Sequence, residues 1–358
     1  MIWRLDSTRT KRRLLLLVFF LLTFWSSAVA VRNVHDIIEV KIMSNNMKTV
    51  CVGRFLIDAP NDARVTYRHI HLSYWDISVI SDESDEQFAT RLAAKELELK
   101  AKKNEKGGPY IESTTTIDTD DIKGKIFVLD RSWVYGFEYG KRVDSTFAAT
   151  LAHVRTNGIS VFFSSKMGDD SVDELSQIIK QIKALKPGEI PPEPGFCFGR
   201  AMIRDPLTAS QSESAVMFLS LKGHDDFSIA LDTAAGLDPD RTLLERDADA
   251  RAPFLFQIHS LRSGKRDING MPGEEVVDRY TESNLTVSHA CDWETAGVKT
   301  DLFKPQLSFE LSTGYSQHAG AKPLNSSLSE TAILELWDTL LSSIRLRPTT
   351  PEHRTGQD

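Results

Sequence analysis

A ten-residue motif occurs twice in this chain, first as Cys51-Val52-Gly53-Arg54-Phe55-Leu56-Ile57-Asp58-Ala59-Pro60 and again as Cys197-Phe198-Gly199-Arg200-Ala201-Met202-Ile203-Arg204-Asp205-Pro206. Five of the ten positions match in register, at an offset of 197 − 51 = 146 residues. That offset is too long for a solenoid repeat and fits two related domains in tandem. Because the motif alternates like a strand and ends near a proline, we predict that it forms the first strand of each lobe.

A proline-rich segment separates the two copies. Residues 186–195 contain four prolines and two glycines, a composition that excludes a helix or a central strand. We therefore predict a stiff linker over residues 188–195. It would join an N-terminal lobe of residues 31–187 to a C-terminal lobe of residues 196–348.

Both halves contain short alternating segments and end with the same helical signal. Segments 125–129 and 145–155 are among the predicted strands of the first half. The capping-box pattern Ser171-x-x-Glu174 precedes one amphipathic segment, and Ser327-x-x-Glu330 precedes another. A third such pattern, Ser84-x-x-Gln87, opens a helix within the first half. Since strands and helices do not strictly alternate, we predict an α+β fold of two related lobes, each a mainly antiparallel sheet with about two helices.

The N-terminus has the features of an export signal. Basic residues precede an apolar run from Leu14 to Trp25, and Ala28-Val29-Ala30 has the small-x-small pattern of a signal-peptidase site. We predict a signal peptide over residues 1–30, cleavage after Ala30 and a periplasmic location. The alternative is an uncleaved anchor, which would be the chain's only contact with a membrane. The polar residues 349–358 are expected to form a disordered tail.

Charge and cysteine content restrict the partners and the covalent bonds. A net charge of −7 argues against nucleic-acid binding and suits either plain solubility or a basic protein partner. Three cysteines in an exported chain leave at least one unpaired. A Cys197–Cys291 disulfide within the second half is the simplest proposal. A Cys51–Cys197 bond is the alternative if the two copies of the motif meet, and buried free thiols also remain open.

No familiar catalytic motif is present, so we predict no catalytic, cofactor or metal site. His69 and His71 have a spacing that can hold a metal, but no third ligand is apparent and a structural role is favoured. Arg54 and Arg200 hold equivalent motif positions, and we expect each to pair with a carboxylate inside its own lobe rather than bind a ligand. An exported hydrolase with an unrecognised carboxylate pair and a cell-envelope scaffold remain the alternative functions.

One compact loop is a candidate contact site for a partner. Gly270 and Gly273, with a proline between them, fix a turn from which Glu274 and Glu275 project. A plain surface turn is the alternative interpretation.

The repeated Cys-x-Gly-Arg motif, the proline-rich linker, Gly195-Phe196-Cys197-Phe198 and Gly270-x-x-Gly273-Glu274-Glu275 together resemble a known family. It comprises the two-domain immunity proteins that protect bacteria from type VI secretion lipase effectors. The resemblance spans roughly residues 45–348. It implies a periplasmic non-enzyme that binds a cognate phospholipase and blocks substrate access by a two-lobe grip. One departure is that Asp58 in the first copy corresponds to Arg204 in the second.

Overall fold

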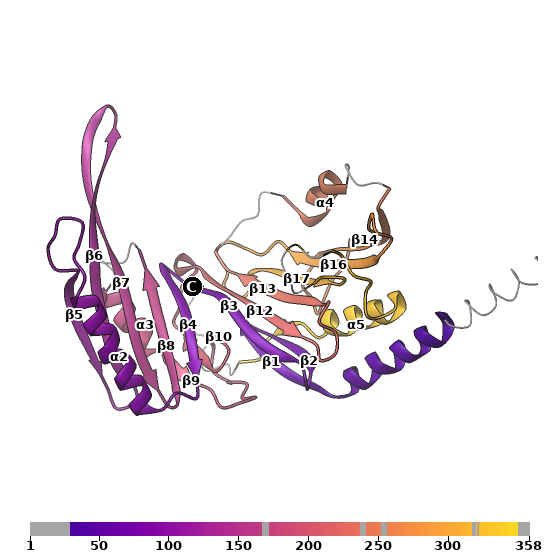
Figure 1. The fold of residues 1–358 in the computed structure, drawn as a ribbon, viewed down its shortest axis with the longest axis horizontal. Coiled ribbons are helices and arrows are strands. Elements are labelled where there is room, and N and C mark those ends of the chain that lie inside the picture. Colours follow the sequence, from indigo (N-terminus) through magenta and orange to yellow (C-terminus); the bar gives the residue numbers. More distant parts are fainter. Residues whose placement is uncertain are drawn as a thin grey trace, which may run out of the picture.

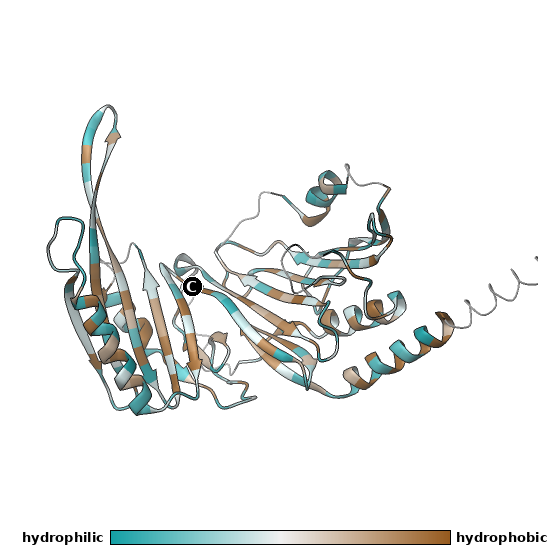
Figure 2. Ribbon diagram, viewed as in Figure 1, coloured by the Kyte–Doolittle hydropathy of each residue, from teal (hydrophilic) through white to brown (hydrophobic). Residues whose placement is uncertain are grey.

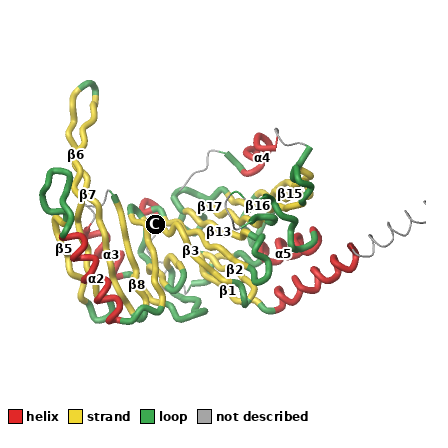
Figure 3. Tube along the Cα trace, in the orientation of Figure 1, coloured by secondary structure: helices red, strands yellow, loops and turns green. Residues whose placement is uncertain are grey.

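The computed structural model describes residues 29–166, 172–236, 241–251, 256–316, 320 and 322–349. The chain follows one order of elements twice (Figures 1 and 3). The first half contains β1 (Met47–Gly53), β2 (Phe55–Pro60), β3 (Arg64–Leu72), β4 (Trp75–Ser81), α2 (Asp85–Lys100), β5 (Ile111–Asp118), β6 (Lys123–Glu138), β7 (Lys141–Thr156), β8 (Ile159–Ser165), α3 (Val172–Lys180) and β9 (Ile182–Ala184). The second contains β10 (Gly195–Phe198), β11 (Ala201–Arg204), β12 (Glu213–Ser220), β13 (Ser228–Ala234), α4 (Leu243–Arg251), β14 (Ile258–Lys265), β15 (Glu274–Thr281), β16 (Val287–Thr295), β17 (Gln306–Ser312), α5 (Glu330–Ser342) and β18 (Arg345–Leu346).

Most strands belong to one antiparallel sheet that runs through both halves. Its order is β14-β15-β16-β17-β13-β12-β3-β4-β8-β7-β6-β5. Strands β3 and β12 pair at its centre, and each strand on one side has its counterpart at the matching place on the other. The α+β class and the antiparallel sheets are thus confirmed. The sequence did not indicate that the two halves would be joined into one sheet.

The prediction that each repeated motif forms a single strand is wrong: the chain turns at Gly53 and at Gly199, with φ of 57° and 63°, so each motif contributes to a hairpin. The two hairpins are exchanged between the halves. Hairpin β1–β2 and hairpin β10–β11 lie in a second sheet of order β18-β2-β1-β10-β11-β9. Phe55 and Ile57 of the first hairpin pack with Trp337 of α5, in the core of the second half. Phe196 of the second hairpin packs with Ile178 of α3, in the core of the first half. Each half therefore completes its core with the other half's hairpin, and the two halves form one body.

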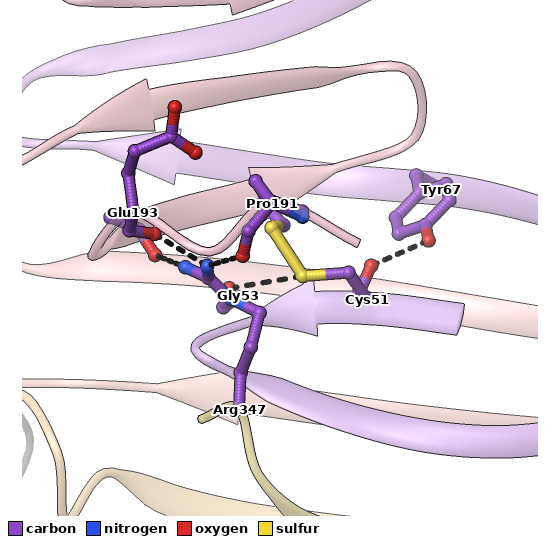
Figure 4. The surroundings of a disulfide bond; sticks show 8 residues. Cys51, Gly53, Tyr67, Pro191, Glu193 and Arg347 are labelled. Atoms are coloured by element: carbon purple, nitrogen blue, oxygen red, sulfur yellow. Dashed lines mark hydrogen bonds between the residues drawn. A yellow bond between two sulfur atoms is a disulfide. The ribbon is translucent and has the colours of Figure 1, made fainter. Parts of the chain in front are cut away.

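A pseudo-twofold axis passes between the two copies of the motif. Val52 lies opposite Phe198 in the β1–β10 pairing, and these residues are equivalent in the repeat. The disulfide joins Cys51 to Cys197, which are also equivalent (Figure 4). The predicted Cys197–Cys291 bond is wrong: Cys291 is a free thiol buried in the core of the second half. Exchange of the hairpins brings Cys51, rather than Cys291, next to Cys197.

The departure at Asp58 and Arg204 follows from what each hairpin meets. Asp58 forms an ion pair with Arg345, 3.1 Å away, just beyond α5. Arg204 instead donates hydrogen bonds to the backbone carbonyls of Lys180 and Gln181, at the C-terminal end of α3. A cation at that end of a helix is electrostatically favourable. Asp58 and Arg204 thus differ because each contacts the C-terminal end of the closing helix of the opposite half, α5 for Asp58 and α3 for Arg204.

The proline-rich segment is held against the body by one buried arginine. Arg347 donates hydrogen bonds to the backbone carbonyls of Pro191, Glu193 and Gly195, at 2.6, 2.5 and 2.7 Å (Figure 4). Burial lowers the pKa of Arg347 to about 10. Three carbonyl acceptors compensate part of the cost of burying its charge.

The helix starts agree only in part with the predictions. Ser84 and Gln87 form the predicted capping box at the start of α2. The box expected at Ser327 does not form, because α5 begins two residues later, with Ser329 as its N-cap. Asp36 accepts the backbone N–H of Ser329 at 2.8 Å. It lies in a helix over residues 29–45 that packs beside α5. Ser171 lies outside the described residues.

Both predicted terminal segments fall largely outside the described residues. Residues 1–28 of the expected signal peptide and residues 350–358 of the expected tail are not described. The expected cleavage point at Ala30 lies near the start of the helix over residues 29–45. No helix in the described part of the chain has the length and apolar character needed to cross a membrane.

Candidate interaction site

Arg54 is a buried structural residue that links the two halves. Its guanidinium donates to Asp205 at 2.8 and 2.9 Å and to Glu213 at 2.7 and 3.1 Å. Its carbon Cζ also lies 4.9 Å from the ring centre of Phe303. Burial opposes the charge on Arg54, but the two carboxylates raise its pKa above the ordinary value. A bidentate arrangement of this kind fixes geometry and uses four of the five N–H donors of the guanidinium within the protein.

Arg200, the counterpart of Arg54 in the second copy of the motif, also forms an ion pair with a carboxylate, but this pair is exposed to solvent. It forms an ion pair with Asp82, whose side chain is 80% exposed, and donates to the backbone carbonyl of Leu185. Both arginines thus pair with carboxylates, as expected. However, all three carboxylate partners lie in the half of the chain opposite to their arginine, so the expectation of pairing within a lobe is wrong. Exchange of the hairpins again accounts for the difference.

The predicted contact loop uses its acids within the protein. Glu275 is buried and accepts hydrogen bonds from Trp337 Nε1, at 2.7 Å, and from Arg266. Glu274 accepts the backbone N–H of Leu244 at 2.9 Å, at the start of α4. Gly273 lies so close to the Trp293 ring that an added Cβ would be 2.6 Å from it. Among the four residues of the predicted contact site, only Gly270 is exposed; Gly273 and Glu274 are half-buried and Glu275 is buried.

A cavity of about 330 Å³ lies beside this loop. Gly273 and Glu274 line it together with Arg241, Lys265 and Asp267. The loop and the N-terminal end of α4 thus form one recessed, mixed-charge surface. Contact between this loop and a partner remains a prediction. Buried Glu275 would not touch the partner and instead holds the loop through its hydrogen bonds to Trp337 and Arg266.

Among the described residues, His69 and His71 do not come together with a third ligand in the spacing of a metal site. A bulge in the β3–β12 pairing separates His69 from His71, and His71 Nδ1 lies 3.3 Å from Asp76. Within the described residues, one group has the spacing of a metal site: His35, Asp36 and Glu39. Asp36 already accepts the N–H of Ser329, and the remaining two ligands are exposed or half-buried.

Two serine–histidine–glutamate arrangements occur near the start of α5, and their geometry argues against a nucleophilic triad. In such a triad, histidine Nε2 accepts the serine proton and Nδ1 faces the carboxylate. Here Nδ1 faces the serine and Nε2 faces the glutamate in both cases: Ser327–His224–Glu39, at 2.8 and 3.3 Å, and Ser326–His289–Glu330, at 3.1 and 3.2 Å. Both hold the segment that leads into α5.

Strands β13, β17 and β16 carry an acidic face on the second half. Asp232, Asp292 and Glu310 point to the side of the sheet opposite the core, and no ion pair to any of them is found among the described residues. Asp292 lies directly opposite Glu310 in the sheet. Burial, together with Glu310 and Glu294, raises the pKa of Asp292 to about 7. Like charges directly opposite each other destabilise a sheet, so the fold itself gains nothing from this arrangement.

The equivalent face of the first half is covered. There α2, a helix of 16 residues, buries Phe88 and Leu99 against the sheet. Its counterpart α4 has 9 residues and no buried side chain. Two arginines of α4 neutralise acids at one end of the face: Arg246 pairs with Glu294 at 2.6 Å, and Arg251 pairs with Asp278 at 2.7 Å. The short helix therefore gives no ion pair to Asp232, Asp292 or Glu310 among the described residues; Glu310 is exposed and the two aspartates are half-buried.

Sequence reasoning missed this face because its members come from three separate strands. A signal exists in Asp292 and Glu294, which alternate with the core residues Cys291 and Trp293. This alternation places both acids on the solvent side of a strand. Only the strand order, however, brings Asp232 and Glu310 alongside them.

Two solved structures share this fold. One solved structure, of a Tle4–Tli4 complex, is similar with a TM-score of 0.70 and 24% identity, covering 86% of this chain and 99% of the other. A second is the type VI secretion immunity protein TplEi from Pseudomonas aeruginosa with an "L" peptide. It has a TM-score of 0.68 and 23% identity, and covers 86% of this chain and all of the other. The fold is thus that of type VI secretion immunity proteins.

Family profiles make the assignment specific. The N-terminal domain of Tle cognate immunity protein 4 matches residues 48–185, and the C-terminal domain of the same family matches residues 189–349. This chain belongs to the Tle cognate immunity protein 4 family. No curated protein matches it. The family resemblance expected from the repeated motif is confirmed.

Proposed function

We propose that this chain is a periplasmic, non-enzymatic immunity protein that binds and inhibits a type VI secretion phospholipase. The observation that carries the proposal is the pair of family matches, which together include both halves of the chain. The signal-like N-terminus supports export, because residues 1–30 have a basic region, an apolar run and an A-x-A site.

Inhibition would depend on a surface that is already in place before the effector arrives. The two halves share a continuous sheet and exchange hairpins, so the surface they present together is rigid. A preformed surface avoids the cost of ordering a flexible one during binding. We therefore propose that the halves hold the phospholipase as a single body and block access of its substrate. This replaces a picture in which two separate lobes dock in succession.

The acidic face supports binding to a basic region of the effector. Three neighbouring carboxylates without ion pairs attract a basic surface, and its approach would relieve their mutual repulsion. The raised pKa of Asp292 implies that such binding releases a proton near neutral pH, because a nearby cation favours the ionised carboxylate.

Two experiments test this proposal: a survival assay, and a binding measurement on a pair of variants matched in charge. Periplasmic expression of the cognate effector, to be sought as a lipase with a G-x-S-x-G motif encoded beside this chain's gene, should kill cells, and this chain should protect them only when residues 1–30 are present. Binding is then measured by calorimetry for Asp232→Asn/Asp292→Asn/Glu310→Gln. The control is Asp118→Asn/Asp120→Asn/Asp121→Asn, which changes net charge equally in the first half.

We expect the acidic-face variant to bind at least about tenfold more weakly, which is about 1.4 kcal/mol, while the control variant binds normally. The acidic-face variant should also fold at least as stably as the wild type, because it removes like-charge repulsion. Equally weakened binding in both variants would mean that the affinity depends on the net charge of the chain and not on the acidic face. Failure of the wild-type chain to bind or protect would reject the proposed function.

A second candidate function is an exported hydrolase, and one observation favours it. Asp292 has a pKa near neutrality and lies opposite Glu310, so the pair resembles a general acid beside an ionised carboxylate. Hydrolysis of lipids or glycosides by the purified chain, abolished by Asp292→Asn, would support this function over inhibition.

A further inference from the structure

A two-stranded ribbon extends from the first half well beyond the sheet (Figure 1). Strands β6 and β7 have 16 residues each, whereas their counterparts β15 and β16 have 8 and 9. Strand β5 pairs with β6 only as far as Leu129, and β8 pairs with β7 only from Thr150 onward. Residues 132–147 therefore pair only with each other, around a turn at Tyr139 and Gly140 with φ of 48° and 79°.

One face of this ribbon carries three aromatic side chains, beside the ion-paired Arg142 and Asp144 of the opposite strand. Trp133, Tyr135 and Phe137 alternate along β6 and so lie on the same face, with exposed fractions of 36, 63 and 69%. The rings of Tyr135 and Phe137 meet edge to face at 6.2 Å. Lys106 Nζ lies 3.6 Å from the ring centre of Trp133, and Arg142 Cζ lies 4.5 Å from that of Tyr135. These contacts hold the rings in place while leaving much of their surface in solvent.

The fold does not require this ribbon. The other half builds the same sheet with short strands at the matching position. An isolated two-stranded hairpin is only marginally stable in water, and exposed apolar rings favour aggregation. Figure 2 shows hydrophobic residues along the ribbon, far from either core. A feature with these costs, absent from the equivalent place in the same chain, indicates a binding role.

The charges on the ribbon favour an apolar protein surface over a membrane. Residues 132–147 contain Glu138 and Asp144 as acids and Lys141 and Arg142 as bases, which gives a net charge of zero. Arg142 also pairs with Asp144 at 2.8 Å. Attachment to an anionic bilayer depends on an excess of basic residues, and the ribbon has none.

We propose that the aromatic face of the β6–β7 ribbon inserts into the apolar mouth through which the effector admits its lipid substrate. The inference rests on the proposed function, since an enzyme that cleaves phospholipids has to present an apolar surface to acyl chains. Tyrosine and tryptophan fit such a surface well, because they offer large contact areas with few rotatable bonds. The ribbon would then occupy the place of the substrate, while the acidic face binds a different, basic region.

The test uses the full-length chain and the cognate lipase effector of the survival assay, carrying a Ser→Ala change at the nucleophile. The aromatic-face variant is Trp133→Ser/Tyr135→Ser/Phe137→Ser. The matched control is Val134→Thr/Val143→Thr, which changes the opposite face of the same ribbon. A third variant deletes residues 132–147 and closes the strands with Asn-Gly, a sequence suited to a tight hairpin turn. Circular dichroism and thermal unfolding establish that each variant is folded.

Calorimetry should give binding that is weaker by a factor on the order of 100 for the aromatic-face and deletion variants. The control should bind within about threefold of the wild type. A micellar short-chain phosphatidylcholine should compete with the wild-type chain and leave the residual binding of the deletion variant unchanged. Wild-type affinity in the aromatic-face variant would overturn the inference.

Three outcomes separate this inference from the proposed function. If the wild-type chain binds the lipase and the ribbon variants bind equally well, the inference fails and the proposed function stands. If the wild-type chain sediments with phosphatidylglycerol vesicles and only this property is lost in the aromatic-face variant, the ribbon is a membrane element and the inference is wrong. If the wild-type chain does not bind the lipase, the proposed function itself fails.

Discussion

Replacing Arg54 with methionine should cost far more stability than the same change at Arg200, although both arginines hold the same place in the repeated motif. Arg54 is paired with Glu213, whose side chain is only 4% exposed. Removing one member of a buried pair leaves an uncompensated charge, which typically costs about 3–5 kcal/mol. Arg200 is paired with Asp82, which is 80% exposed, and such surface pairs contribute about 0–1 kcal/mol. The two variants should therefore differ by about 3 kcal/mol.

Guanidinium unfolding followed by tryptophan fluorescence measures this difference, with Arg200→Met as the internal control. The cost of Arg54→Met should also depend on pH. Burial raises the pKa of Glu213 in the folded state, and loss of Arg54 removes the main opposing influence. A raised folded-state pKa means that stability falls as pH rises above the unfolded value. The deficit should hence be smaller at pH 5 than at pH 8. Equal midpoints for the two variants, or a deficit independent of pH, would refute the reasoning.

Two more stability predictions follow from the same structure. The disulfide closes a span of 146 residues, so Cys51→Ala/Cys197→Ala should lower the free energy of unfolding by about 5 kcal/mol in the chain-entropy description. That variant should unfold identically with and without reductant, whereas Cys291→Ala should keep the reductant sensitivity of the wild type. Asp292→Asn should remove a pH dependence of the stability. Asp292 has a folded-state pKa of about 7, so it binds its proton more tightly in the folded state than in the unfolded one. The free energy of unfolding of the wild type should therefore fall by up to about 4 kcal/mol between pH 4 and pH 7. Parallel stability profiles for wild type and Asp292→Asn over that range would contradict this.

The repeated motif predicted where each half begins but not which core it completes. Alternation of apolar residues shows that one side of a strand is buried. Phe55 and Phe196 satisfy that pattern equally well in either core, so the exchange of hairpins leaves no local signature. The wrong disulfide follows from this single gap, since the bond to Cys197 depends on which hairpin lies beside it.

The candidate surfaces were hidden for a related reason. The segment between the predicted strands 125–129 and 145–155 continues as a ribbon because residues 132–147 pair with each other over their whole length. Asp232, Asp292 and Glu310 come together only through strand order. Local propensity and periodicity predict elements, whereas a surface made by several elements depends on register and topology.

The internal repeat also distinguishes the features that both halves use to fold from those that occur in one half only. Two halves with the same strand order both reach a packed core, so features found in only one half are dispensable for folding. The long ribbon and the acidic face are such features, and each has a cost, through exposed rings in one case and like-charge repulsion in the other. Substitutions there should leave stability unchanged or improve it while weakening the complex. Substitutions along the shared hairpins, at Arg54 or the disulfide, should instead lower stability first and reduce binding only through the loss of folded protein.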